Sequence, residues 1–113
     1  MIARIALPLI FLSSSAFAGS STFKGTIDSI VCHADNISPI CHVKVNGTPA
    51  NLGCGTSSWH YTFDATTTEG QNFLSILLAA QLSGKTISLA GQGTCNLTGG
   101  SADLRHVIIT TAN

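Results

Sequence analysis

The four cysteines of this 113-residue chain limit its possible folds more than any other feature. They are Cys32, Cys41, Cys54 and Cys95. An even number of cysteines in a short exported chain indicates disulfides, and four cysteines allow three pairings. We favour Cys32–Cys41, which closes a hairpin, and Cys54–Cys95, which ties the middle of the chain to its last third. Loop-closure entropy predicts contributions of about 2.7 and about 4 kcal/mol, respectively.

The first 18 residues carry the three parts of a secretory signal. One positive charge, Arg4, precedes an apolar run over residues 5–12, and residues 16–18 form an A-x-A cleavage site. We expect cleavage after Ala18, which leaves a single domain of residues 19–113 in a secreted or periplasmic location. The apolar run is shorter than the roughly 20 residues that cross a bilayer, so we expect no membrane span.

Charge excludes some partners. Without Arg4 the chain has four basic and five acidic residues. Such a balance gives no electrostatic footprint for nucleic acid or for an anionic membrane, so we expect neither as a partner.

The period of the apolar residues predicts five short strands and one helix. The strands cover residues 22–34, 40–45, 57–64, 85–89 and 103–110. In the first strand the apolar parity changes between Ile27 and Ile30, which indicates a bulge or a sharp bend.

The predicted helix lies between the third and fourth strands. Thr66 and Glu69 have the spacing of a capping box, and Gly84 is the expected C-terminal cap. The order β-β-β-α-β-β is that of the OB-fold, so we predict a mainly β, five-stranded OB-fold-like barrel with one helix and two disulfides. The helix would plug one open end of this barrel.

The segment from Cys54 to Cys95 carries a family likeness. Between the two cysteines stand the aromatic strand WHYTFD at residues 59–64, the helical segment TEGQNFLSILLAA at 68–80 and GKTI at 84–87. In these motifs the chain resembles small exported bacterial OB-fold proteins of uncharacterised function. More distantly, and mainly in topology, it resembles the B subunits of the subtilase-cytotoxin and typhoid-toxin type.

The toxin subunits are pentamers that bind host glycans. The resemblance therefore implies a barrel, the second disulfide, a glycan or protein partner and a homo-oligomer. The subunits' sugar-binding residues have no matching motif here, so none is carried over.

Two histidines adjoin the first predicted bridge, His33 and His42. Their spacing fits no zinc motif, because the chain has no C-x-x-C pair. With Cys32 facing Cys41 across an antiparallel pair, we expect the two histidines on opposite faces. We therefore expect no metal site, and no other cofactor.

No arrangement in the sequence indicates catalysis, so we expect a protein that is not an enzyme. Ser58 and His60 are typical of a solvated strand face, and Asp64 and Glu69 are interpreted as charges at the start of the helix.

The candidate ligand-binding residues are Trp59, His60, Tyr61 and Arg105. Aromatic rings stack on sugars, and the histidine and arginine add polar groups. The alternation of Trp59 and Tyr61 with Phe63 favours the other interpretation, in which both rings face the core. The expected function is that of a secreted binding module. The alternative is a structural or accessory periplasmic protein without a small ligand.

Overall fold

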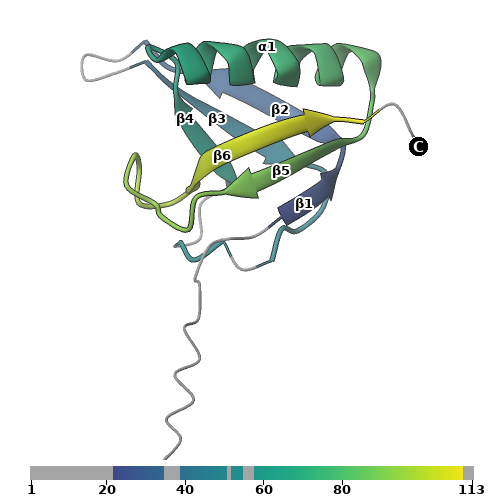
Figure 1. Cartoon of the computed structure of the whole chain (residues 1–113). Helices are drawn as coiled ribbons and strands as arrows, with labels where there is room; N and C mark the ends of the chain where they lie inside the picture. The colour runs from purple at the N-terminus through teal and green to yellow at the C-terminus, as the bar shows by residue number, and fades with distance from the viewer. Residues whose placement is uncertain (1–21, 35–38, 51, 55–57, 111–113) are drawn as a thin grey trace, which may run out of the picture.

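The computed structural model describes residues 22–34, 39–50, 52–54 and 58–110 (Figure 1). The predicted signal peptide lies outside these residues. The described part forms six strands and one helix. No helix in this part is long and apolar enough to cross a bilayer. The elements are β1 (Thr22–Gly25), β2 (Ile27–Cys32), β3 (Ile40–Val45), β4 (Tyr61–Asp64), α1 (Thr68–Ser83), β5 (Ile87–Gly91) and β6 (Ala102–Ile109).

One curled sheet contains all six strands, in the order β1-β5-β6-β4-β3-β2. Every neighbouring pair is antiparallel except β4 and β6, which are parallel. The strands β1 and β2 are the two halves of the predicted first strand, and they stand at opposite ends of this order. The sheet therefore curls towards closure (Figure 1), and the predicted OB-fold-like barrel is confirmed, with its first strand divided.

The division of the first strand confirms the predicted bend. Thr26 separates β1 from β2, and the pairing of β2 with β3 shifts register between Ile27 and Ser29. Asn46 holds this corner: its backbone N–H donates to Thr26 O over 3.0 Å, and its side-chain amide donates to Thr26 Oγ1 over 2.9 Å.

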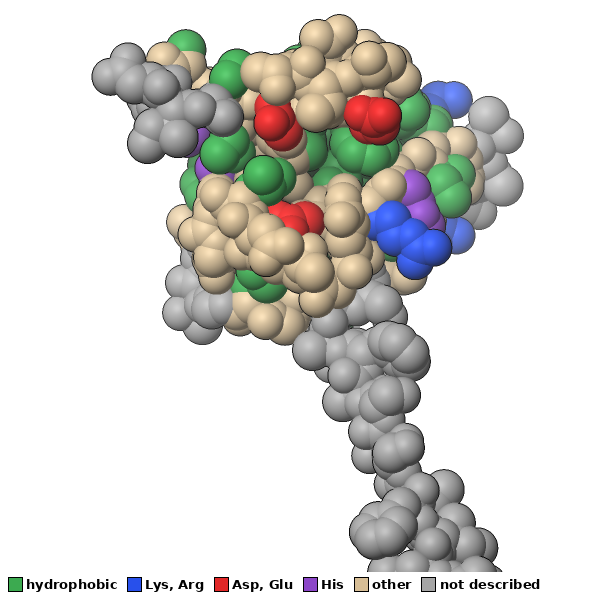
Figure 2. Space-filling view, turned by 60° about the vertical axis from the view of Figure 1, so that its left-hand side comes forward, with side chains coloured by type: hydrophobic (Ala, Val, Ile, Leu, Met, Phe, Trp, Pro, Cys, Tyr) green, Lys and Arg blue, Asp and Glu red, His purple; other side chains and the backbone are tan. Residues whose placement is uncertain are grey.

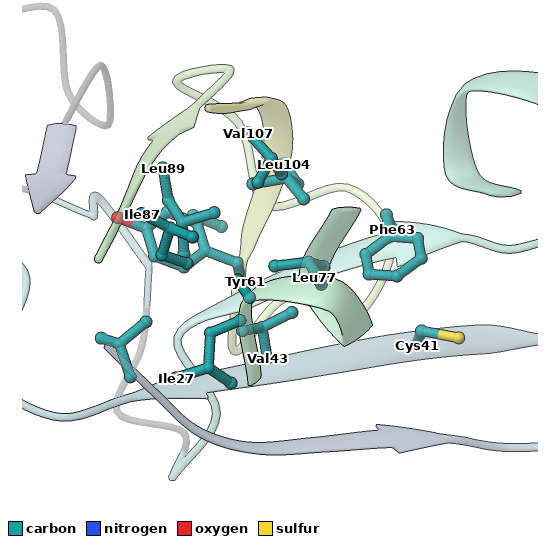
Figure 3. Packing of buried hydrophobic residues seen from close by; sticks show 13 residues of the cluster. Ile27, Cys41, Val43, Tyr61, Phe63, Leu77, Ile87, Leu89, Leu104 and Val107 are labelled. Atoms are coloured by element: carbon teal, nitrogen blue, oxygen red, sulfur yellow. The ribbon is translucent and has the colours of Figure 1, made fainter. Parts of the chain in front are cut away.

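The core lies between the inner face of the sheet and α1. Alternate residues of the strands point inward, as the period of two predicts. The helix contacts both β2 and β6, so it bridges the two sides of the curled sheet (Figure 1). Leu77 of α1 is fully buried and points at the sheet (Figure 3), among Ile27, Val43, Tyr61, Phe63, Ile87, Leu89, Leu104 and Val107.

The helix starts one residue later than predicted. Its N-cap is Thr67, whose hydroxyl oxygen accepts from Gly70 N over 2.9 Å, so the capping box on Thr66 is wrong. The reason is the approach of Gly70 to the end of β4: a Cβ atom at Gly70 would lie 1.8 Å from Asp64 O. Only glycine allows this contact, which fixes where the helix begins. The predicted C-cap is confirmed, since Gly84 has the left-handed φ of 66°.

Both predicted disulfides are confirmed. Cys32 and Cys41 are directly opposite partners in the β2–β3 pair, and Cys54 and Cys95 join the segment after β3 to the β5–β6 connection. The first bridge therefore closes one hairpin, whereas the second joins the β3–β4 connection to the β5–β6 connection.

Replacing Leu77 by alanine should lower the free energy of unfolding by about 2–5 kcal/mol, because it leaves a cavity under the helix. Urea unfolding measures the change. Leu82→Ala is the matched control, since Leu82 is 87 % exposed on the same helix and its loss should cost less than about 0.5 kcal/mol. Equal losses in the two variants would contradict this account of the core.

The two disulfides should differ in how much they stabilise the chain. Their sequence separations are 9 and 41 residues, so removing Cys54–Cys95 should cost about 4 kcal/mol and removing Cys32–Cys41 about 2.7 kcal/mol. Urea unfolding of the two double serine variants tests this order. A larger loss from the short loop would show that loop closure does not dominate.

Candidate functional site

A pocket of about 300 Å³ opens where β4 and β6 separate. The two strands pair only at Tyr61–Ala102 and Thr62–Asp103. Beyond these pairs they diverge, and the first turns of α1 cover the gap (Figure 1). The pocket has the size of a small-ligand site.

The floor of the pocket is apolar and its rim is acidic. Phe63 and Phe73 meet edge to face with ring centres 5.9 Å apart, and Leu97 and Leu104 complete the apolar part. Figure 2 shows this hollowed face, with carboxylates around apolar side chains. The three acidic residues that line the pocket are Asp64, Glu69 and Asp103, and no lysine, arginine or histidine of the described residues lines it.

Asp103 organises the connection that leads into β6. It is only 5 % exposed. Its Oδ2 accepts from Thr94 Oγ1 over 2.5 Å and from Asn96 N over 2.9 Å, and its Oδ1 accepts from Leu97 N over 3.1 Å. These bonds satisfy a buried carboxylate and hold Leu97 at the edge of the pocket.

The other two carboxylates belong to the start of the helix. Asp64 Oδ1 accepts from the hydroxyl of Thr66 over 2.6 Å and from its backbone N–H over 2.8 Å. These two hydrogen bonds, the hydroxyl's first, lower the pKa of Asp64. Glu69 stands in the first turn of α1, where the helix dipole favours a negative charge. The carboxylate of Asp64 therefore stays charged near neutral pH.

An amide and a hydroxyl add hydrogen-bonding capacity. Gln92 lines the pocket, and its side-chain amide donates to Leu104 O over 3.0 Å. Thr62 and Thr67 line it as well, but the hydroxyl of Thr62 contacts His42 on the outer face, so only Thr67 offers its hydroxyl to the pocket. The pocket thus combines acceptors, a hydroxyl and aromatic edges without a positive charge.

A pair of histidine side chains lies on the outer face of β2 and β3. The ring centres of His33 and His42 are 5.4 Å apart, with the ring planes at 76°. The prediction that these histidines lie on opposite faces is therefore wrong. The register explains why: His42 pairs with Val31, and positions 31 and 33 share one face of the strand. The two histidines are diagonal neighbours across the pair, within reach of each other.

His42 is half-buried between Thr62 of β4 and Trp59, which precedes that strand. Its Nδ1 lies 3.0 Å from Thr62 Oγ1, and its ring centre lies 6.0 Å from that of Trp59. Burial, and then the charge of His33, lower the pKa of His42. His42 is therefore neutral at neutral pH.

His60 is held in its neutral form by the backbone. Its Nδ1 accepts from Val45 N over 3.1 Å. Burial, and then the charge of Lys44, lower the pKa of His60.

The four predicted ligand-binding residues lie in different surroundings and do not form one site. Trp59 is half-buried against His42, and His60 follows it; both precede β4, which starts later than predicted. Tyr61 is fully buried in the core (Figure 3). Arg105 is exposed and is the extra residue where the β5–β6 register shifts. None of the four lines the pocket.

The residues that do line the pocket were missed as a group. Asp64 and Glu69 were interpreted only as charges at the helix start, which is part of their role. The available signal was Asp103, an acidic residue between Ala102 and Leu104 in an apolar strand. A buried carboxylate in a strand needs partners, so its neighbourhood is a candidate site.

No group of three or more histidine, cysteine, aspartate or glutamate residues in the described part of the chain is arranged to hold a metal ion. Comparison with family models, with curated proteins and with solved structures found no match to this chain.

Stability should fall as the pH drops through about 6.5. His42 and His60 bind a proton more weakly in the folded chain than in the unfolded chain, so acid favours the unfolded state. We expect a lower melting temperature at about pH 5.5 than at about pH 7.5, because histidine side chains change their charge between these two pH values.

The variant with both His42→Gln and His60→Gln should lose part of this pH dependence compared with the parent chain. Scanning calorimetry at the two pH values makes the comparison. An unchanged slope in the double variant would contradict the assignment.

Proposed function

We propose that this protein is an exported binding module whose pocket between β4, β6 and α1 holds an uncharged sugar of a glycan. The observation that carries this proposal is the pocket's lining: an apolar aromatic floor with carboxylates, an amide and the Thr67 hydroxyl around it. Sugar hydroxyls donate to carboxylates, and the C–H faces of a sugar pack on aromatic rings.

The charge of the pocket limits the class of sugar that it can bind. Its three carboxylates face no lysine or arginine within the described lining, so a sugar that carries a carboxylate or a sulfate would be repelled. A neutral sugar suits the site better than an acidic one.

Export is supported by the signal pattern at residues 1–18 and by the two disulfides, since disulfides persist in oxidising compartments. The resemblance to toxin B subunits supports glycan recognition and a homo-oligomeric ring. We assign no catalytic role.

A second candidate is a structural or accessory protein that contacts another protein. The exposed apolar side chains favour it: Leu82 is 87 % exposed at the end of α1, and Ile108 is 48 % exposed on β6. In that case these positions, and not the pocket, would carry the interaction.

A glycan array probed with the oxidised chain should show binding to neutral glycans and little to acidic ones. Glu69→Ala should weaken binding of the best glycan roughly tenfold or more, because a hydrogen bond to a charged group contributes about 1.5–3 kcal/mol. Titration calorimetry measures the change, and Leu82→Ser, far from the pocket, should bind as the parent does.

A blank array, or binding unaffected by Glu69→Ala, would overturn the pocket assignment. A blank array together with a protein partner that Leu82→Ser fails to retain would instead support the accessory role.

A further inference from the structure

The outer face of the β2–β3 hairpin holds two histidines in a rigid frame. His33 follows Cys32 and His42 follows Cys41, and the Cys32–Cys41 disulfide joins the two strands at this point. A backbone hydrogen bond of 2.9 Å from His33 N to Ile40 O continues the pairing past the bridge. The backbones that carry the two imidazoles are therefore held at a fixed separation.

The distance between the two rings suits a shared metal ion. An ion bound by one nitrogen of each imidazole at about 2 Å keeps the ring centres roughly 4.5 Å apart at the angle of about 90° in tetragonal Cu²⁺ and roughly 5 Å apart at the tetrahedral angle of Zn²⁺. The observed separation is 5.4 Å. His33 is exposed, so its ring turns with little steric cost to aim a nitrogen at the ion.

His42 is already oriented as metal-binding histidines are. Its Nδ1 lies 3.0 Å from Thr62 Oγ1. When Nδ1–H donates to that hydroxyl, Nε2 is left as the ligand, and a partner on the second ring nitrogen is the usual way in which a ligating histidine is held.

We propose that His33 and His42 form a binding site for a divalent transition-metal ion, with Cu²⁺ bound most tightly. Imidazole nitrogen suits copper, nickel and zinc, and Cu²⁺ has the highest affinity in this series. Two protein ligands leave the other positions to water or to an outside ligand, so the ion exchanges readily. This site is separate from the pocket and does not depend on the proposed function.

Trp59 provides a direct readout. It is the only tryptophan of the chain, and its ring centre lies 6.0 Å from that of His42. A paramagnetic Cu²⁺ ion at His42 should therefore quench its fluorescence.

The oxidised chain is titrated with CuSO₄ near neutral pH, with glycine present as a competing weak chelator. We expect saturable quenching of Trp59 with one ion per chain. His33→Gln and His42→Gln should each weaken binding at least about tenfold. His33 is exposed, so its variant should fold as the parent does, and its melting temperature checks this.

His60→Gln and His106→Gln are the matched controls and should bind Cu²⁺ as the parent does. His60→Gln is the sharper one, since His60 adjoins Trp59 in the sequence. Quenching that does not saturate, that survives His33→Gln, or that is lost in His60→Gln would overturn the proposal.

A second measurement is independent of fluorescence. Added Zn²⁺, followed by NMR of the histidine rings, should shift the signals of His33 and His42 and leave those of His60 and His106 in place. Equal shifts in all four would overturn the proposal as well.

Discussion

The bend in the first strand is the constraint on which the rest of the molecule depends. Because the chain turns at Thr26, one continuous stretch pairs with β5 through β1 and with β3 through β2. A straight strand would leave an open sheet with two long edges, and its apolar face would need another cover. With the bend, a single helix bridging β2 and β6 is enough to enclose the core.

Local patterns predicted the strands, the bend, the helix and the disulfides, because each of these follows from neighbouring residues or from cysteine order. Local patterns did not predict the pocket, because its walls come from distant parts of the sequence; only Asp103, an acidic residue in an apolar strand, pointed to its neighbourhood. The pocket exists because β4 and β6, about 40 residues apart, stop pairing after Thr62 and Asp103. The helix start was missed by one residue because Thr66 and Thr67 both fit a cap, and only the contact of Gly70 with Asp64 O decides between them.

Thr62 belongs to both sites described above. Its backbone pairs with that of Asp103 and it lines the pocket, while its hydroxyl lies 3.0 Å from His42 Nδ1 on the outer face. Trp59, one of the predicted ligand-binding residues, lies beside His42. The aromatic segment therefore marked the neighbourhood of the histidine pair. The prediction that His33 and His42 lie on opposite faces used the right register, since His42 does pair with Val31, but it assigned the two side chains to the wrong faces.

The connectivity of the disulfides has a consequence for how the chain oxidises. Each cysteine is bonded to its neighbour in sequence order, the first to the second and the third to the fourth. In a chain delivered N-terminus first to an oxidising compartment, the native partners of Cys41 and Cys95 enter that compartment before them. An oxidase that joins cysteines in order of arrival would produce the native pattern directly, without reshuffling by an isomerase.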